Sequence, residues 1–246
     1  MFSFEKVTHV KFKSKGAIIA EQILLNIKSG KYPAGIKLPA ERVIAEQMGI
    51  SRPSLREAIS ALQIVGIIES RPGDGNYIAR NLNTDERSFQ LKNILEESDS
   101  PYEILQARRV IETGSVRMAI KEATDEDIQK IKSAWEEKYK IGLAGDYNAY
   151  IRLGRQLHLS IARATKNRII IAVIDRLLNI TSQPLWQNMR QLHYQKDPSR
   201  IKQMLDIHDR IVNAVQARDS DEAIRALEAD FDTVIEQIYH LENVKE

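Results

Sequence analysis

The stretch from residue 38 to residue 78 constrains the fold of this chain more than any other part of it. Pro39 suits a first helical turn, where an amide hydrogen would have no partner, and Gly49 can take the left-handed conformation that ends a helix. Directly after this turn, Ser51 is a good N-cap for a second helix, which we expect to end near Val65. The sequence therefore predicts two short helices joined by a tight turn.

The second of these helices has an apolar and a basic side. Its apolar stripe, at helical spacing, consists of Leu55, Ile59, Leu62 and Val65. Arg52 and Arg56 lie four residues apart and project together away from that stripe. Cations near the start of the second helix of such a pair suit contact with the major groove of DNA. The plainer alternative is that these arginines form an ordinary solvated face.

A β-hairpin is expected next. Short extended segments at residues 67–70 and 76–78 flank a turn, residues 71–75, that is rich in glycine and proline. The glycines of this turn would let the backbone come close to a phosphate strand. As a nucleotide-binding phosphate loop the turn is a poor match, because a third glycine and the strand-to-helix context are missing.

Together these segments resemble the winged helix-turn-helix of GntR-type bacterial transcription regulators. The resemblance covers roughly residues 16–80 and rests on GKYPAGIKL at 30–38, PAER at 39–42, SRPSLREAISALQIVGII at 51–68 and RPGDGNYI at 71–78. It implies a wing that enters the minor groove with Gly73 at its tip, and operator contacts from Arg42, Ser51, Arg52, Ser54 and Arg56. An arginine suits guanine O6 and N7, whereas a serine suits phosphate or base-edge hydrogen bonds. Ser54 could instead serve only in capping the helix.

Length and charge indicate two domains. A chain of 246 residues is long enough for two cores. Residues 1–80 hold 12 basic and 7 acidic side chains, whereas residues 81–246 hold 24 and 27, so a basic first part precedes a slightly acidic second part. This asymmetry fits a DNA-binding head, residues 1–80, attached to a body, residues 81–246, that does not touch DNA.

Composition also argues against a membrane or secreted protein. The longest aliphatic stretch, residues 169–174, is far too short to span a bilayer. The N-terminal residues have neither the apolar core nor the cleavage site of a secretory signal. Cysteine is absent, which excludes disulfides and thiolate metal sites. We therefore expect a cytoplasmic protein with no membrane partner.

From about Thr84 onward the sequence indicates helices and no convincing strand. The expected helices cover residues 84–97, 101–122, 125–144, 147–165, 168–193, 199–217 and 220–243. Thr124 and Ser220 each precede acidic residues, which places negative charge at the positive end of a helix dipole. The predicted fold is mainly α, with an N-terminal winged helix-turn-helix and a C-terminal all-α antiparallel helical bundle.

Three polar side chains fall on helix faces that should be apolar. His158, His208 and Asp230 each lie on or beside the apolar stripe of a different helix. A buried carboxylate requires a cation or strong hydrogen-bond donors. Two imidazoles and a carboxylate from three helices would make a site for Zn, Ni, Mn or Fe with open coordination positions. The alternative for each histidine is an ordinary hydrogen-bonded core position.

The second half of the chain resembles the effector domain of the FadR subfamily, called FCD, which accompanies such heads. The resemblance rests on RRVIE at 108–112, LHLSIARATKN at 157–167 and HDRIVNAVQARDSDEAIRALEAD at 208–230. It implies a divalent metal held by Asp-x-x-x-His on one helix and by one histidine on each of two later helices. His158 and His208 match two of these ligands, but Gly154 replaces the aspartate and Asp230 replaces the last histidine. Both a rearranged three-ligand site and a decayed, metal-free site are compatible with this departure.

Arg108 is the candidate ligand for a small-molecule effector. It lies on the inward stripe of the first long helix of the body, and a buried guanidinium needs an anion that suits its planar fork, such as a carboxylate. In the resembled family the matching arginine helps to hold an organic acid. The alternative is an internal salt bridge with Asp230 or Glu112.

These observations predict a homodimeric transcription regulator, a repressor rather than an activator, that binds a pseudo-palindromic operator in double-stranded DNA. A small carboxylate bound in the body would change the spacing of the two heads and weaken operator binding. Two alternatives stay open, namely a metal-responsive regulator and a metal-dependent hydrolytic enzyme with a DNA-binding head. We expect no enzyme, because the sequence offers no nucleophile motif, no phosphate loop and no general base beside the three polar residues.

Overall fold

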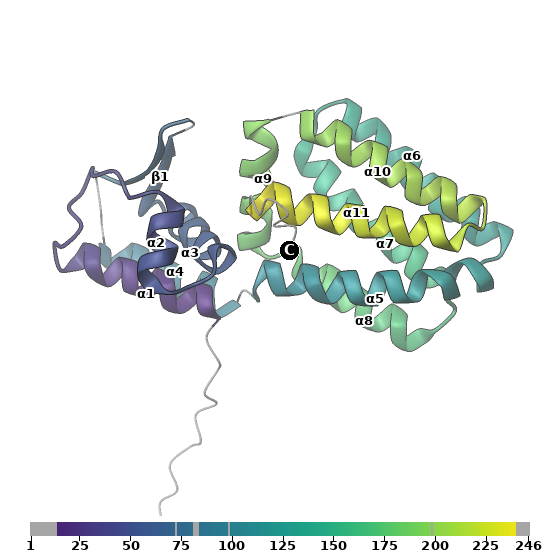
Figure 1. Cartoon of the computed structure of the whole chain (residues 1–246), viewed down its shortest axis with the longest axis horizontal. Helices are drawn as coiled ribbons and strands as arrows, with labels where there is room; N and C mark the ends of the chain where they lie inside the picture. Colours follow the sequence, from purple (N-terminus) through teal and green to yellow (C-terminus); the bar gives the residue numbers. More distant parts are fainter. Residues whose placement is uncertain (1–13, 72, 81–83, 98, 198, 240–246) are drawn as a thin grey trace, which may run out of the picture.

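The computed structural model describes residues 14–71, 73–80, 84–97, 99–197 and 199–239. Over these residues the chain forms a small head beside a larger helical body (Figure 1). The head contains α1 (Lys15–Lys28), α2 (Glu41–Met48), α3 (Arg52–Ile64), β1 (Ile68–Arg71), β2 (Gly75–Ile78) and α4 (Thr84–Glu97). The body contains α5 (Pro101–Glu122), α6 (Asp125–Leu143), α7 (Tyr147–Ala164), α8 (Arg168–Ile180), α9 (Pro184–Lys196), α10 (Ser199–Gln216) and α11 (Ser220–Tyr239).

The helix-turn-helix forms as its local signals predict. Gly49 ends α2 in the left-handed conformation, with φ +63°. The hydroxyl of Ser51 accepts the amide hydrogen of Ser54 and so caps α3. Leu55 and Leu62 of α3 are completely buried, and α3 packs against both α1 and α2. These contacts fix the orientation of α3 within the head.

The predicted hairpin is a two-stranded antiparallel wing in which Ile68 pairs with Ile78. Gly73 lies in its turn with φ +75°, a conformation that favours glycine. Asp74 beside it accepts hydrogen bonds from Lys37 at 2.7 Å and from the Tyr77 hydroxyl at 2.6 Å. The acidic residue of the turn is therefore paired with a cation from the segment before α2, which reduces its repulsion of phosphate.

Helix α4, which lies within the residues assigned from the sequence to the body (81–246), packs against the head. Leu91 and Leu95 are buried, and α4 packs against α1 and α3. The guanidinium of Arg87 also donates to the carbonyl of Gly66 at the end of the helix-turn-helix. The spacing of its leucines predicts an amphipathic helix but not the domain on which that helix packs. Residues 1–13 and 240–246 of the two predicted domains lie outside the described residues.

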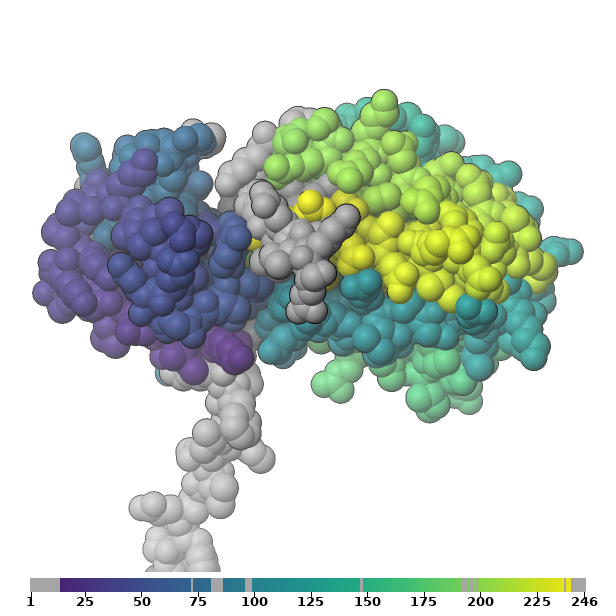
Figure 2. All heavy atoms as spheres, in the orientation of Figure 1, coloured from purple at the N-terminus to yellow at the C-terminus, as the bar shows by residue number. Residues whose placement is uncertain are grey.

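The body is the expected helical bundle, and one predicted helix is present as two shorter helices. The single helix expected over residues 168–193 is divided into α8 and α9, because Thr181 caps the end of α8 and Pro184 begins α9. A proline is tolerated in the first turn of a helix but would break the hydrogen-bond ladder further along. Helices α10, α11 and α5 pack in succession, and α6 and α7 cover α10 and α5 (Figures 1 and 2). No helix among the described residues is long and apolar enough to cross a membrane.

Candidate functional site

The predicted DNA-contacting residues all lie on the head, where some are exposed and others are held by contacts within the protein. Gly73 is exposed at the wing, and the side chain of Arg42 is 69% exposed and paired with Glu46 one turn later in α2. Ser51 and Ser54 form a hydrogen bond of 2.8 Å between their hydroxyl groups at the start of α3. Ser51 therefore makes the cap, and the Ser54 hydroxyl is bound to it.

Arg52 and Arg56 differ in their surroundings although both project from α3. The Nε atom of Arg52 is buried and has no hydrogen-bond partner among the described residues. Arg56 forms an ion pair with Glu41 of α2, and its Nη1 atom donates to the carbonyl of Ile238 at 2.9 Å. Ile238 lies at the end of α11, so this predicted operator contact is bound to the body. Its proposed contact with DNA would require this bond to open.

A second polar link between head and body is centred on Glu57, which the sequence reasoning missed. One carboxylate oxygen of this buried residue of α3 accepts from Ser100 Oγ at 2.8 Å, Tyr102 N at 3.1 Å and Tyr239 Oη at 3.2 Å. Burial raises the pKa of Glu57 despite these donors. Helix α3 also packs against α5, α9 and α11. The helix that carries the predicted operator contacts is thus also the helix that joins head to body.

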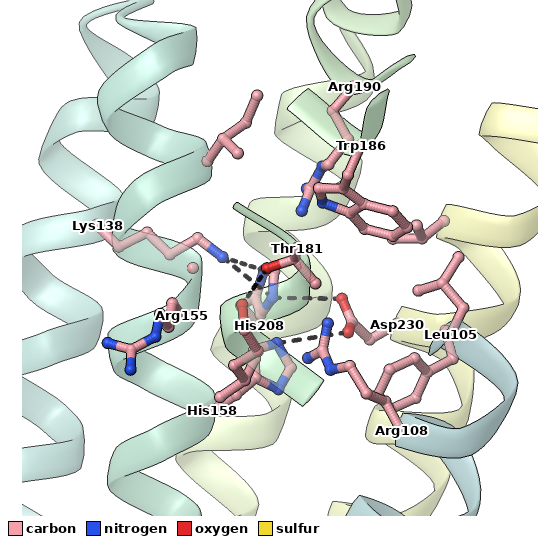
Figure 3. Close-up of a pocket in the computed structure, with 15 residues that line it drawn as sticks. Leu105, Arg108, Lys138, Arg155, His158, Thr181, Trp186, Arg190, His208 and Asp230 are labelled. Carbon is pink, nitrogen blue, oxygen red and sulfur yellow. Dashed lines mark hydrogen bonds and ion pairs between the residues drawn. The ribbon is translucent and has the colours of Figure 1, made fainter. Parts of the chain in front are cut away.

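The three polar residues predicted in the bundle do come together. His158 of α7, His208 of α10 and Asp230 of α11 are all buried, and one ligand atom from each lies within 4.8 Å of the others. They line a cavity of about 30 Å³ between all seven helices of the body, α5 to α11. Figure 3 shows these side chains converging with Arg108 and Lys138. The helical spacing in the sequence was sufficient to find all three.

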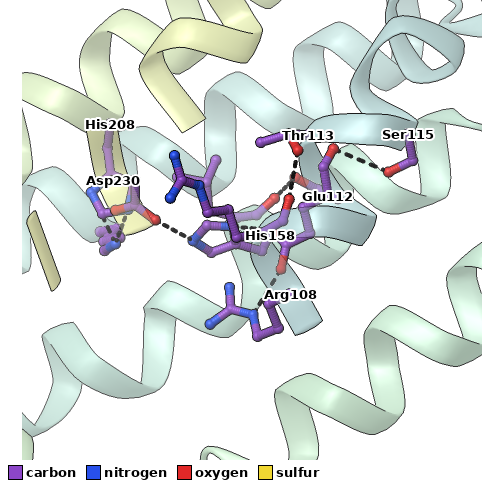
Figure 4. A network of polar contacts seen from close by, with 11 residues as sticks. Arg108, Glu112, Thr113, Ser115, His158, His208 and Asp230 are labelled. Carbon is purple, nitrogen blue, oxygen red and sulfur yellow. Dashed lines mark hydrogen bonds and ion pairs between the residues drawn. The ribbon is translucent and has the colours of Figure 1, made fainter. Parts of the chain in front are cut away.

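Hydrogen bonds determine which ring nitrogen of each histidine faces the cavity (Figure 4). His208 donates from Nδ1 to the carbonyl of Met204 at 2.7 Å, because a carbonyl can only accept. His158 donates from Nδ1 to Glu112 at 2.7 Å. Although burial opposes ionisation, Arg108 and His158 lower the pKa of Glu112 to about 2, so this partner is a carboxylate. Nε2 of His208 therefore remains as an acceptor, 3.3 Å from the carboxylate of Asp230, and Nε2 of His158 faces the same carboxylate at 3.7 Å.

Arg108 forms an internal salt bridge and also has a free donor that could bind an effector, so it has features of both alternatives considered for it. Its Nε atom donates to Glu112 at 2.7 Å, so one of the suggested internal salt bridges is present and the other, with Asp230, is not found among the described residues. Its Nη2 atom is buried without a hydrogen-bond partner in the same part of the chain, and the side chain lines the cavity. A buried guanidinium donor without an acceptor is unfavourable, which leaves a position where an anion would bind well.

Lys138 of α6 is a further cavity residue that the sequence reasoning did not identify. Its Nζ atom lies 3.1 Å from Nε2 of His208. Burial lowers the pKa of Lys138 to about 7 and lowers the pKa of His208 well below its usual value, so His208 is neutral. A signal was present in the sequence, because Lys138 continues the buried stripe formed by Ile131, Trp135 and Gly142.

The residues around Asp230 do not fit a divalent metal ion as they are arranged. Two Nε2 atoms and a carboxylate would suit Zn or a related ion. However, the Lys138 amine lies beside the His208 ring, 3.1 Å from Nε2 and 3.3 Å from Nδ1, and Gly154 contributes no carboxylate. A metal ion on Nε2 would lie close to this amine, and two cations so near each other in a buried site repel strongly.

Comparisons with known proteins agree with this two-part organisation. Residues 16–78 match the family described as "Bacterial regulatory proteins, gntR family", and residues 103–233 match the FCD domain. The Exu regulon transcriptional regulator of Escherichia coli K12 is 30% identical over 228 residues, which are 92% of this chain and 81% of that protein. The Uxu operon transcriptional regulator of the same organism is 31% identical over 96% of this chain and 85% of its own length.

Two further proteins extend these comparisons. The HTH-type transcriptional regulator LutR of Bacillus subtilis is 28% identical over 89% of this chain and all of its own length. A solved structure of E. coli McbR/YncC is 19% identical, covers 92% of this chain and 98% of its own, and has a TM-score of 0.49. The related proteins are transcription regulators and not enzymes, as the sequence predicted. This chain belongs to the GntR family of bacterial DNA-binding transcription regulators, with a winged helix-turn-helix head and an FCD body of the FadR type.

Proposed function

We propose that this regulator binds a pseudo-palindromic operator as a homodimer and releases it when a small carboxylate occupies the cavity of the body. The protein would work as a repressor in the cytoplasm, where bacterial DNA lies. The observation that carries the effector proposal is the unpartnered Nη2 atom of Arg108 in a buried cavity. A carboxylate would supply the acceptor that this nitrogen lacks.

The charges around the cavity also favour an anion. Its lining contains four basic side chains, Arg108, Lys138, Arg155 and Arg190, and one acidic side chain, Asp230. Arg108 is paired with Glu112 and Arg155 with Asp175. Lys138 and Arg190 have no carboxylate within ion-pair distance in the part of the chain that is described. Because buried cations without counterions are costly, an anionic ligand would stabilise this cavity.

Two helices that line the cavity also reach the head. Trp186 and Arg190 lie on α9, and Asp230 and Val234 lie on α11. Both helices pack against α3, and α11 carries the carbonyl that holds Arg56. The cavity of about 30 Å³ has room for about two water molecules. A carboxylate therefore has to displace side chains or helices to enter, and these displacements would pass directly to α3, with an expected coupling of about 1–3 kcal/mol.

Titration with carboxylates of increasing size tests the effector proposal. We would measure calorimetric binding and melting temperature of the whole chain with acetate, L-lactate, succinate and citrate, and use glycerol as the uncharged control. At least one carboxylate should bind, raise the melting temperature, and change the affinity for operator DNA. Absence of binding by every carboxylate in the panel would contradict the proposal.

The homodimer is proposed because one head contacts only half of a pseudo-palindromic operator. The body offers a suitable surface on the adjacent helices α5 and α8. Val110 is 73% exposed and is followed on the same face of α5 by Gly114 and Met118, while Ile169 is 74% exposed on α8. Exposed apolar side chains on neighbouring helices favour burial against a second copy.

Replacing both Val110 and Ile169 with arginine is expected to convert the dimer into monomers, because two buried charges per subunit would face each other across the interface. Light scattering after size-exclusion chromatography would measure the mass. Leu143→Arg is the matched control, since Leu143 is 66% exposed but lies at the end of α6. A double variant that remains dimeric would show that the subunits associate elsewhere.

A further inference from the structure

We propose that the amine of Lys138 serves as the resident cation of the cavity, in the position where a divalent metal ion would bind to His208 and Asp230. The site then binds its effector without a metal. This inference rests on the proposed effector cavity, but it concerns which cation the cavity holds and can be tested without any effector.

The acceptors of the cavity require a positive group between them. Nε2 of His208 carries no hydrogen, because Nδ1 donates to Met204, and it lies 3.3 Å from Oδ1 of Asp230. Nε2 of His158 lies 3.7 Å from Oδ2 of the same carboxylate. The lone pair of His208 Nε2 and the Asp230 carboxylate are close together in one buried space, and they repel each other unless a cation or a proton donor is shared between them.

Lys138 is placed to supply this cation. Its side chain is 2% exposed, and Nζ lies 3.1 Å from Nε2 of His208. The same ammonium lies 4.6 Å from the centre of the Tyr150 ring, a favourable cation–π position. The lysine is thus held by an acceptor and by an aromatic face, and its donors are directed into the cavity (Figure 3).

Gly154 provides the space that Lys138 occupies. A Cβ atom at position 154 would lie 3.5 Å from Nζ and 3.9 Å from Cε of Lys138. An aspartate there would extend further from that Cβ and would meet the ammonium group or displace it. Gly154 and Lys138 therefore form a complementary pair in which the missing side chain of one accommodates the amine of the other.

A metal ion and this lysine exclude each other. A metal bound to His208 would lie about 2.1 Å from Nε2, whereas Nζ already lies 3.1 Å from the same atom. The two cations would lie close together in a buried site, where their repulsion is strong. Combining Lys138→Met with Gly154→Asp should consequently create a four-ligand metal site. Its ligands would be His158, His208, Asp230 and the carboxylate introduced at position 154.

Titration of the full chain with Ni²⁺ and Zn²⁺ alone tests this inference, using calorimetry and elemental analysis after dialysis. The wild-type protein should retain less than about 0.1 metal ion per chain, whereas the Lys138→Met, Gly154→Asp double variant should retain about one and bind it at least about 100-fold more tightly. Lys138→Met alone should bind metal with intermediate affinity, and Gly154→Asp alone should bind it more weakly than the double variant.

Either of two results would overturn the inference. One is a wild-type protein that binds a stoichiometric divalent metal at the cavity, and this measurement needs no variant to fold. The other is a set of variants that are folded by circular dichroism but gain no metal. The carboxylate titration gives a separate answer, because an effector that binds only with added metal would refute the role of Lys138 while leaving the effector proposal intact.

Discussion

Arg52→Ala is expected to weaken binding to the specific operator by about 1–3 kcal/mol, or roughly 5- to 150-fold, because a bidentate contact between arginine and guanine contributes about this much discrimination. Arg52 begins α3 and carries a buried Nε atom with no partner among the described residues. The side chain lies away from the core stripe, so the variant should fold normally. Fluorescence anisotropy at one fixed salt concentration, with specific and random duplexes, measures the effect.

The change should be largest for the specific duplex and small for random DNA. Arg42→Ala is the comparison variant, since Arg42 is the exposed cation of α2 and would contact phosphate or a base edge. A phosphate contact would weaken binding to both duplexes about equally and reduce the salt dependence. If Arg52→Ala binds the operator as tightly as the wild type does, α3 does not read bases through this residue.

Arg108→Gln is expected to weaken carboxylate binding about 10- to 150-fold, which corresponds to loss of a charge-assisted hydrogen bond of about 1.5–3 kcal/mol. Its free Nη2 donor is the group that we expect an effector carboxylate to engage. Affinity for operator DNA in the absence of effector should stay unchanged, because Arg108 does not lie on the head. Calorimetry with the carboxylate selected from the panel measures the first quantity, and anisotropy measures the second.

Arg109→Gln provides the matched control for this prediction. Arg109 follows Arg108 directly on α5, but its side chain is 39% exposed and is paired with Asp232 at 2.8 Å. Exposed pairs of this kind contribute little to stability. The control should bind the carboxylate like the wild type does. Equal losses in the two variants would point to general positive charge and not to a specific contact, and the assignment of Arg108 would then be wrong.

The helix-turn-helix could be predicted from sequence because its determinants are local. Gly49, Ser51 and the spacing of the leucines act within a few residues of one another, and the structure shows the expected turn and cap. The clustering of His158, His208 and Asp230 could also be predicted from the sequence. Each of them lies on the inward stripe of its own helix, and a bundle brings inward stripes together.

The features that could not be predicted depend on how distant elements pack. Helix α4 packs against α1 and α3 of the head, although its own pattern is compatible with packing on either domain. Arg56 has the spacing of a DNA-contacting residue, yet in this arrangement it binds Glu41 and the end of α11. Lys138 was missed because a lysine on a helix is usually solvated, and its contact with Gly154 of α7 arises only when the helices pack.

The double role of α3 gives the regulatory proposal its physical basis. The helix carries Arg52 for DNA and Glu57 for the contacts with Ser100, Tyr102 and Tyr239. Any ligand that moves α9 or α11 changes the surroundings of the same helix. Differential binding to two arrangements of head and body is all that allosteric control requires.

Selection from a library of random DNA duplexes tests the central claim most directly. The whole chain would be incubated with the library at about 150 mM salt, where non-specific phosphate contacts are weakened, and the bound duplexes would be sequenced. We predict enrichment of an inverted repeat whose half-sites are separated by about one helical turn, as expected for two heads related by twofold symmetry. Recovery of duplexes without any common sequence would contradict the claim that α3 reads an operator.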